Sequence, residues 1–165
     1  MYTDRILKIS VIDDDAQMRE MIKDFITGKY PSSEVNIYST GEEALKSIID
    51  EQDFIVLDYN LDSIDPSAMN GLQALKKLKT LFPLVPVIFL SGQENAEVAA
   101  NTMKYGAWDY IVKNESSFIR MEIHINNILG NVDLKKNLGS QKFFNRLLAF
   151  LVLALIAGMI YMRLN

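Results

Sequence analysis

The chain has 165 residues, enough for one compact domain and a further short segment. It contains no cysteine, which excludes a disulfide framework and a thiolate metal site. The net charge of −4 is uneven, because residues 1–129 carry 12 Lys/Arg against 20 Asp/Glu. Such an acidic domain lacks the basic face that phosphate backbones require, so we expect no nucleic-acid partner. The first ten residues hold early charges and no long apolar stretch, which argues against a signal peptide.

Two kinds of apolar segment alternate along the first 129 residues. Short runs rich in β-branched residues predict strands, and longer runs with apolar residues at helical spacing predict helices. The predicted strands are 6–12, 34–38, 54–57, 85–90 and 109–112, and the predicted helices are 16–28, 42–50, 72–82, 96–106 and 117–129. Thr40 followed by Glu43 is a capping-box signature at the start of the second helix. Five β–α units predict an α/β domain with a doubly wound parallel sheet and helices on both faces.

Polar residues suited to chemistry follow four of the predicted strands. The first strand is followed by Asp13, Asp14 and Asp15, and the third, fourth and fifth by Asp58, Ser91 and Lys113. The carboxyl ends of parallel strands share one edge of a sheet, so we expect these side chains to converge. Converging carboxylates favour a divalent cation, and Mg²⁺ suits a site of few carboxylates with water and phosphate oxygens. A carboxylate beside such an ion can attack a phosphoryl donor, with Lys113 and Ser91 stabilising the transferred group.

Each of these residues also has an ordinary structural explanation. Aspartate is common after strands because it favours turns and helix N-caps, and Asp15 is best explained as the cap of the helix that begins at Ala16. Ser91 or Lys113 alone would more often be structural than functional. The combination of Asp-Asp, Asp, Ser and Lys at four strand ends, in this order, is much more specific.

In these residues the chain resembles bacterial two-component response-regulator receiver domains, over about residues 5–129. The matching motifs are VIDDDAQMRE, FIVLDYN, VIFLSGQ and GAWDYIVK. The resemblance implies a flavodoxin-like sheet of strand order 2-1-3-4-5 flanked by five helices. It further implies that Asp58 is the phosphoacceptor. Mg²⁺ or Mn²⁺ would be held by Asp13, Asp14, Asp58 and the backbone carbonyl of Asn60.

The resemblance also implies roles for the residues around the phosphoacceptor. Ser91 would bond the phosphoryl group, Lys113 would pair with it, and Tyr110 would be the aromatic that swings inward on activation. Asn60 and Gln93 would modulate the lifetime of the phosphate. None of these positions departs from the family pattern, so we expect the domain to be competent for phosphorylation.

The resemblance implies a signalling function rather than an enzyme with a separate substrate. A histidine kinase or a phosphotransfer protein would phosphorylate Asp58, and the domain would contribute at most its own phosphotransfer and autodephosphorylation. Output would be a protein–protein contact through the fourth helix, the fifth strand and the last helix of the domain, with a homodimer as one possible form.

The loop after the phosphoacceptor departs from the common receiver pattern. Gly71 comes thirteen positions after Asp58, about five more than usual, and Asp62 stands where a proline is common. A tolerated surface insertion explains this length, since loops lengthen at small entropic cost. The sharper hypothesis is that loop 59–70 changes kinase docking or the lifetime of the phosphate.

Beyond the domain at 1–129, we expect a linker or helix extension at 130–142 and a transmembrane tail anchor at 143–165. Residues 147–162 carry no charge, and as a helix they span roughly 24 Å of the ~30 Å hydrocarbon core. Four basic residues precede this run and one follows it: Lys135, Lys136, Lys142 and Arg146, then Arg163. This bias predicts a domain at the cytoplasmic face of a bacterial inner membrane. The alternative is a helix buried in an oligomer or a partner.

Two other functions stay open at this point. A haloacid-dehalogenase-like phosphohydrolase also places Asp-x-Asp after its first strand, as Asp13 and Asp15 do, and uses a later serine and lysine. The chain lacks the Thr or Val two residues after the second aspartate and an acidic motif after Lys113. The third possibility is a receiver-like scaffold that is never phosphorylated.

Overall fold

The computed structural model describes residues 6–63, 65–92, 94–131 and 146–150. The chain divides into two compact units, Met1–Ile128 and Leu129–Asn165. The elements of the first unit, in chain order, are β1 (Leu7–Ile12), α1 (Ala16–Lys29), β2 (Ser33–Tyr38), α2 (Gly41–Ser47), β3 (Phe54–Asp58), α3 (Gly71–Leu81), β4 (Val87–Ser91), α4 (Ala96–Lys104) and β5 (Asp109–Val112). A last helix, 117–131, begins in this unit and is called helix 117–131 below.

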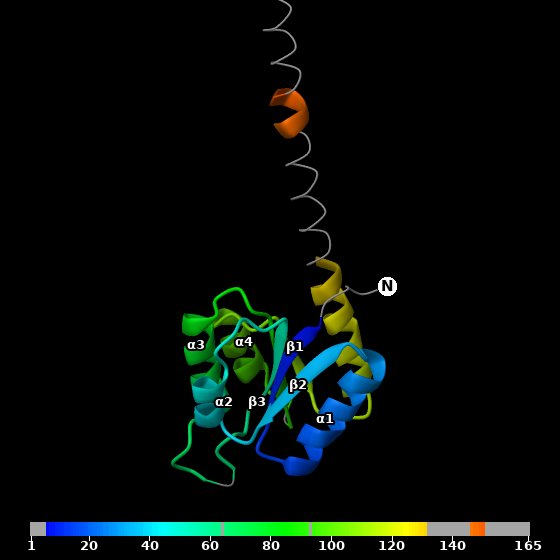
Figure 1. Ribbon diagram of the computed structural model, residues 1–165. Helices are drawn as coiled ribbons and strands as arrows, with labels where there is room; N and C mark the ends of the chain where they lie inside the picture. Colours follow the sequence, from blue (N-terminus) through cyan, green and yellow to red (C-terminus); the bar gives the residue numbers. More distant parts are fainter. Residues whose placement is uncertain (1–5, 64, 93, 132–145, 151–165) are drawn as a thin grey trace, which may run out of the picture. The chain divides into compact units, whose positions relative to one another are not determined.

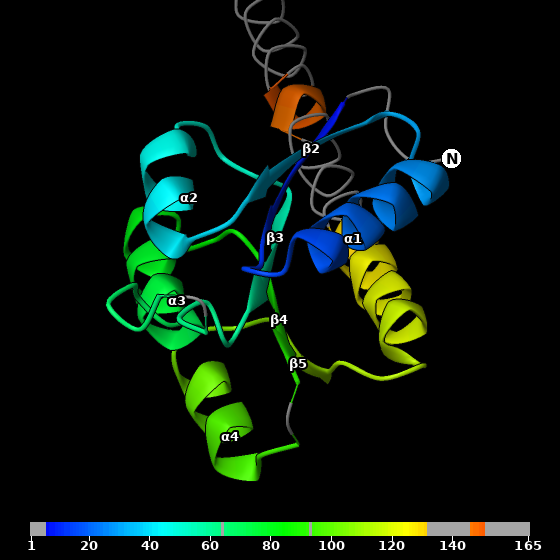
Figure 2. The same cartoon turned by 90° about the horizontal axis from the view of Figure 1, so that it is seen from below.

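The five strands form one parallel sheet in the order β2-β1-β3-β4-β5. Helix α1 and helix 117–131, drawn in yellow, cover one face of the sheet, and α2, α3 and α4 cover the other (Figures 1 and 2). The predicted doubly wound fold and its strand order are therefore confirmed. Strand β2 pairs with one edge of β1, and β3 pairs with the other. The order in which strands are added therefore reverses at β1, and the ends of β1 and β3 lie adjacent.

The core sits on both faces of the two central strands. Every residue of β3 and of β4 is buried, which explains why their sequences are continuous apolar runs rather than alternating ones. Ile22 and Ile26 of α1 and Leu75 and Leu78 of α3 are also buried. Each such side chain contributes about 1.5–3 kcal/mol relative to an exposed one. This burial holds the carboxyl ends of the strands in place.

Helix α1 and helix 117–131 lie side by side on their face of the sheet (Figure 2). The rings of Phe25 and Phe118 are 5.1 Å apart. The Tyr30 hydroxyl donates to Asn126 Oδ1 at 2.9 Å, and Lys29 Nζ lies 3.0 Å from Glu122 Oε1. Of the predicted helices, this last one extends two residues further than expected, to residue 131.

Several predicted helix ends differ in the structure; α3 spans Gly71–Leu81 rather than 72–82, and α4 ends at Lys104 rather than at residue 106. Helix α2 stops at Ser47 rather than at residue 50, because Ile48 takes an extended conformation and its side chain is buried in the core. Its capping box is also incomplete. Thr40 Oγ1 accepts the Glu43 backbone N–H at 3.1 Å, but the Glu43 carboxylate accepts from Ser39 instead of returning to Thr40. Helix α1 continues through Gly28, the expected stop, to Lys29.

The predicted membrane location is wrong. In the ranges described above, the structure has no helix whose length and hydropathy would let it cross a membrane. The prediction rested on the hydropathy of a sixteen-residue run and on the basic residues that precede it; as a helix, the run is already shorter than a ~30 Å hydrocarbon core. Residues 151–162 of that run, and with them most of the predicted C-terminal hydrophobic helix, lie outside the described residues; residues 146–150 are helical and exposed.

Candidate functional site

The carboxyl ends of β1, β3, β4 and β5 lie at one edge of the sheet, and the residues predicted from their spacing meet there. Asp13 follows β1, Asp58 is the last residue of β3, Ser91 is the last residue of β4, and Lys113 follows β5. The carboxylates of Asp13 and Asp58 are almost fully buried, at 1% and 2% exposure. Parallel pairing in register brings these strand ends together, as expected.

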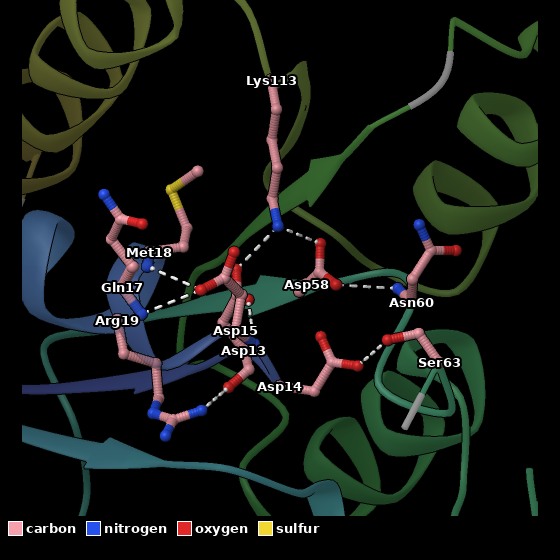
Figure 3. Close-up of polar contacts among 10 residues, drawn as sticks. All are labelled: Asp13, Asp14, Asp15, Gln17, Met18, Arg19, Asp58, Asn60, Ser63 and Lys113. Atoms are coloured by element: carbon pink, nitrogen blue, oxygen red, sulfur yellow. Dashed lines mark hydrogen bonds and ion pairs between the residues drawn. The ribbon is translucent and has the colours of Figure 1, made fainter. Parts of the chain in front are cut away.

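Lys113 joins the two buried carboxylates. Its Nζ lies 2.7 Å from Asp13 Oδ2 and 2.7 Å from Asp58 Oδ1 (Figure 3). Its backbone N–H donates to the Ser91 carbonyl at 2.7 Å, which extends the β4–β5 pairing by one residue and directs the side chain across the sheet edge. One ammonium therefore offsets part of the repulsion between two buried negative charges.

The protonation equilibria reflect this crowding. Burial raises the pKa of the Asp13 carboxyl above its ordinary value, the nearby Asp58 charge adds to the rise, and Lys113 opposes it without cancelling it. Burial acts to lower the pKa of Lys113, but the Asp58 and Asp13 carboxylates outweigh it, so the pKa is raised. The site thus holds more negative charge than its own lysine neutralises, a condition that favours a bound cation.

Asp14 completes a group of three carboxylates. One oxygen from each of Asp13, Asp14 and Asp58 lies within 4.8 Å of the others. Asp13 and Asp58 are buried, whereas Asp14 is partly exposed. Hard divalent cations take oxygen ligands, and Mg²⁺ keeps several waters beside one or two carboxylates, so an open site of this composition suits it.

The orientation of Asp58 is set by the backbone around it. Its Oδ2 accepts the backbone N–H of Asn60 at 2.9 Å. The backbone N–H of Gly71 donates to the Tyr59 carbonyl at 2.9 Å, which brings the start of α3 directly against the end of β3. A Cβ on Gly71 would collide with the Asp58 carbonyl oxygen and come within 2.8 Å of Tyr59 Cα. Only glycine permits this approach, and it is the residue that closes loop 59–70.

Ser91 and Tyr110 lie on the neighbouring strands β4 and β5. Ser91 is buried at the end of β4, next to Val112 in the register. Tyr110 is partly buried and stacks on Phe89, with ring centroids 6.3 Å apart and planes at 17°. Tyr59 also packs on Phe89, with ring centroids 6.1 Å apart. The Phe89 ring on β4 thus contacts both the Tyr110 ring on β5 and the Tyr59 ring, which directly follows β3.

Asp15 does not join the carboxylate group. Its Oδ1 accepts the backbone N–H groups of Gln17 and Met18 at 2.8 and 3.3 Å, so it caps α1 as predicted (Figure 3). A phosphohydrolase of the Asp-x-Asp kind would need this carboxylate in the site beside Asp13. The capping contacts disfavour that alternative. Gln93, the other predicted modulator of phosphate lifetime, lies outside the described residues.

Two contacts at the site were not predicted from the sequence. The Arg19 guanidinium donates from Nη1 to the backbone carbonyl of Asp13 at 2.6 Å. The Ser63 hydroxyl, from loop 59–70, donates to Asp14 Oδ2 (Figure 3). The helical spacing of Arg19 places it one turn into α1 and was a usable signal. No pattern in the sequence indicates the path of a lengthened loop, so the Ser63 contact had none.

Comparison with known proteins identifies the domain. The family model of the response regulator receiver domain matches residues 9–123. The chain belongs to this family. As a receiver domain it is part of a two-component response regulator, in agreement with the resemblance seen in its strand-end motifs.

Known relatives of this receiver domain include longer proteins. It is 36% identical over 115 residues to a protein-glutamate methylesterase/protein-glutamine glutaminase of Bacillus subtilis, covering 68% of this chain and 30% of that protein. It is 35% identical over 130 residues to a glycerol metabolism activator of Pseudomonas putida, covering 77% and 56%. The chain thus spans less than two thirds of the length of either relative. A response regulator receiver domain structure from Clostridium thermocellum matches with a TM-score of 0.66 at 27% identity, covering 78% of this chain and 98% of that one.

Proposed function

We propose that this receiver domain accepts a phosphoryl group on Asp58 from a phosphohistidine of a histidine kinase or a phosphotransfer protein. The observation that carries the proposal is the Lys113 ammonium, 2.7 Å from both the Asp13 and the Asp58 carboxylate. This contact holds a buried nucleophilic carboxylate beside an acidic group and under a positive charge. That is the arrangement that phosphoryl transfer to a carboxylate requires.

A divalent cation, Mg²⁺ or Mn²⁺, would be held by Asp13, Asp14, Asp58 and the backbone carbonyl of Asn60. The clustered oxygens of the three carboxylates and the uncompensated negative charge support this ligand set. When bound, the ion supplies charge stabilisation for phosphate oxygens. Asn60 would join the set because receiver domains use the backbone carbonyl at this position, and its own backbone N–H lies 2.9 Å from Asp58 Oδ2.

In the transfer step, an oxygen of the Asp58 carboxylate attacks phosphorus while the P–N bond to the donor histidine breaks. A new P–O bond gives the acyl phosphate, the electron pair of the broken bond stays on the imidazole nitrogen, and the imidazole leaves as the neutral species because its other ring nitrogen carries a proton. Lys113 then pairs with the phosphoryl oxygens, and the Ser91 hydroxyl donates to one of them. Asn60, together with Gln93, would set how readily water reaches the acyl phosphate and so its lifetime.

Output would be a change of the surface formed by α4, β5 and helix 117–131. Ser91 and Tyr110 lie on adjacent paired strands, and Tyr110 stacks on Phe89, one strand closer to Asp58. A shift of Ser91 towards the phosphoryl group would open space into which the Tyr110 ring turns. The altered surface would bind a downstream protein or a second copy of the domain.

Labelling of the full chain tests the proposal. Incubation with a small phosphodonor such as acetyl phosphate and Mg²⁺ should add one base-labile phosphoryl group, located by peptide mass spectrometry on Asp58. Asp58→Asn and removal of the metal by EDTA should each abolish it. Asp65→Asn is the matched control, because Asp65 is an exposed acid of the same loop whose carboxylate accepts hydrogen bonds from Ser67, away from the three clustered carboxylates.

Two results would contradict the proposal. Label on Asp13 instead of Asp58 would favour the phosphohydrolase alternative. No label from either a small phosphodonor or a panel of phosphorylated histidine kinases, in a chain that is folded by circular dichroism, would favour the scaffold alternative.

A further inference from the structure

We propose that Ser63 is a positioning residue of the metal site, which ties two of the proposed ligands together and strengthens cation binding. The inference rests on the proposed function, because it takes the cation site formed around Asp13, Asp14 and Asp58 as its starting point. Nothing in the family resemblance assigns a role to this position. It is supplied by loop 59–70, which is longer than is common in receivers.

Ser63 contacts two proposed ligands through two different donors. Its hydroxyl donates to Asp14 Oδ2 (Figure 3). Its backbone N–H donates to the Asn60 carbonyl at 3.3 Å. Asp14 comes from the segment after β1 and Asn60 from the segment after β3. A single residue therefore bridges two parts of the site that are far apart in the sequence.

Each of these contacts leaves capacity for a cation. A carboxylate has two oxygens, and the hydroxyl occupies Oδ2 of Asp14 and leaves Oδ1 for a metal. A backbone carbonyl has two lone pairs, so the Asn60 oxygen can accept the weak 3.3 Å hydrogen bond and still ligate. The contacts of Ser63 therefore orient the ligands without competing for the ion.

Asp14 needs such support more than the other two carboxylates do. Asp13 is held by Lys113 and by the Asp15 backbone N–H at 3.0 Å, and Asp58 by Lys113 and the Asn60 backbone N–H. Asp14 is partly exposed, and in the described part of the chain Ser63 is the hydrogen-bond partner of its carboxylate. Without it, Asp14 would lose rotamer freedom only when the ion binds, which weakens binding.

The loop that presents Ser63 is anchored on both sides of it. Leu61 is buried in the core beneath α3, and the Met69 backbone N–H donates to Glu42 Oε1 of α2 at 2.8 Å. Gly71 then closes the loop against Tyr59. Because both ends are held, the position of Ser63 is a property of the fold, and its hydroxyl is available at the site before a cation arrives.

Direct cation binding tests the inference. The dissociation constant of Mn²⁺ is measured on the full chain by electron paramagnetic resonance of the free ion. Groups that hydrogen-bond to metal ligands typically contribute 10- to 100-fold to the affinity for the ion. An exposed hydroxyl belongs at the low end of this range, so Ser63→Ala should weaken Mn²⁺ binding about tenfold. Ser63→Thr retains a hydroxyl and should restore affinity to within about threefold of the unaltered chain by the same reasoning.

Ser67→Ala is the matched control. Its hydroxyl is also in loop 59–70 but donates to Asp65 Oδ1 at 2.7 Å, away from the three clustered carboxylates. We expect its Mn²⁺ affinity to equal that of the unaltered chain. Urea unfolding in EDTA should give the same midpoint for both alanine variants, which separates a positioning role from a loss of folding.

The outcomes are distinguishable. Equal Mn²⁺ affinity for Ser63→Ala and the unaltered chain would overturn this inference and leave the metal site intact. Equal losses in Ser63→Ala and Ser67→Ala would also overturn it, since they would reflect the loop in general. No Mn²⁺ binding by the unaltered chain would overturn the proposed metal site and this inference with it.

Discussion

The strand-end site has two halves that are held in different ways. Its inner half, Asp13, Asp58 and Lys113, is buried at the ends of core strands and joined by two 2.7 Å ion pairs. Its outer half, Asp14 and Ser63, lies on loop segments and is at least partly exposed. Charges in the inner half are costly when unpaired, whereas those in the outer half are solvated. The inner half should therefore affect folding as well as chemistry, and the outer half should affect cation binding alone.

The largest expected effect on stability follows from removing the Lys113 ammonium. Lys113→Met removes the partner of two buried carboxylates and should lower the free energy of unfolding by about 3 kcal/mol in EDTA, measured by urea denaturation. Lys29→Met is the control, because the Lys29–Glu122 pair is exposed and contributes about 0.5 kcal/mol or less. Equal effects of the two substitutions would remove the distinction between a buried and an exposed half.

The close approach of α3 to β3 is expected to rank second. Gly71→Ala places a methyl group against the Asp58 and Tyr59 backbone and should destabilise the fold by about 2 kcal/mol, with lower phosphorylation of Asp58. Gly28→Ala is the control, since no atom lies within 4 Å of a Cβ there and alanine favours a helix. A Gly71→Ala chain as stable as the unaltered one would show that the loop can move away without cost.

Cation binding should separate the two halves more sharply. Mg²⁺ at ten times its dissociation constant should raise the free energy of unfolding by about 1.4 kcal/mol. Asp14→Asn should remove this increase while changing stability in EDTA by less than about 0.5 kcal/mol, as for other partly exposed sites. Asp15→Asn should retain the Mg²⁺ response, because Asn is an equally good N-cap and Asp15 lies outside the carboxylate group.

The smallest expected effect is a pH dependence in the inner half. The pKa of Asp13 is raised on folding, so the folded domain binds this proton more tightly than the unfolded chain does. Its contribution is complete below the ordinary pKa of 3.8 and is lost as the pH rises through the folded value. Asp13→Asn has no such loss, and its stability relative to the unaltered chain in EDTA should increase from about pH 4 to about pH 7.

Urea denaturation at several pH values measures this difference. Lys113 opposes the rise in the pKa of Asp13, so we expect the change of stability with pH to be small. A relative stability that decreases with pH would mean that ionised Asp13 stabilises the fold through Lys113 more than its burial costs.

The elements of the fold were predictable where local pattern and tertiary packing agree. The short apolar runs at 54–57 and 85–90 predicted strands, and they form β3 and β4, in which every residue is buried. The end of α2 was not predictable, because Ile48 leaves helical geometry to place its side chain in the core. Local propensity carries no information about such a competition between helix continuation and burial.

Like the fold, the candidate site could be predicted only in part. Parallel topology brings strand ends to one edge, so Asp13, Asp58 and Lys113 could be grouped from their positions along the chain. The Ser63–Asp14 contact could not be, because a loop of this length has many possible paths. The membrane location was predicted from hydropathy, which scores residues one at a time and does not establish a spanning helix.

The sequence by itself determined the fold class, because periodicity and the order of β–α units indicate a doubly wound parallel sheet. The motifs at the strand ends carried the family resemblance and, with it, the expected strand order. Only the tertiary structure decided how those residues divide the work. Whether a carboxylate is buried against Lys113, caps a helix or faces a loop hydroxyl depends on distances across the sheet edge. Those distances are set by packing between segments far apart in the sequence, which no local pattern contains.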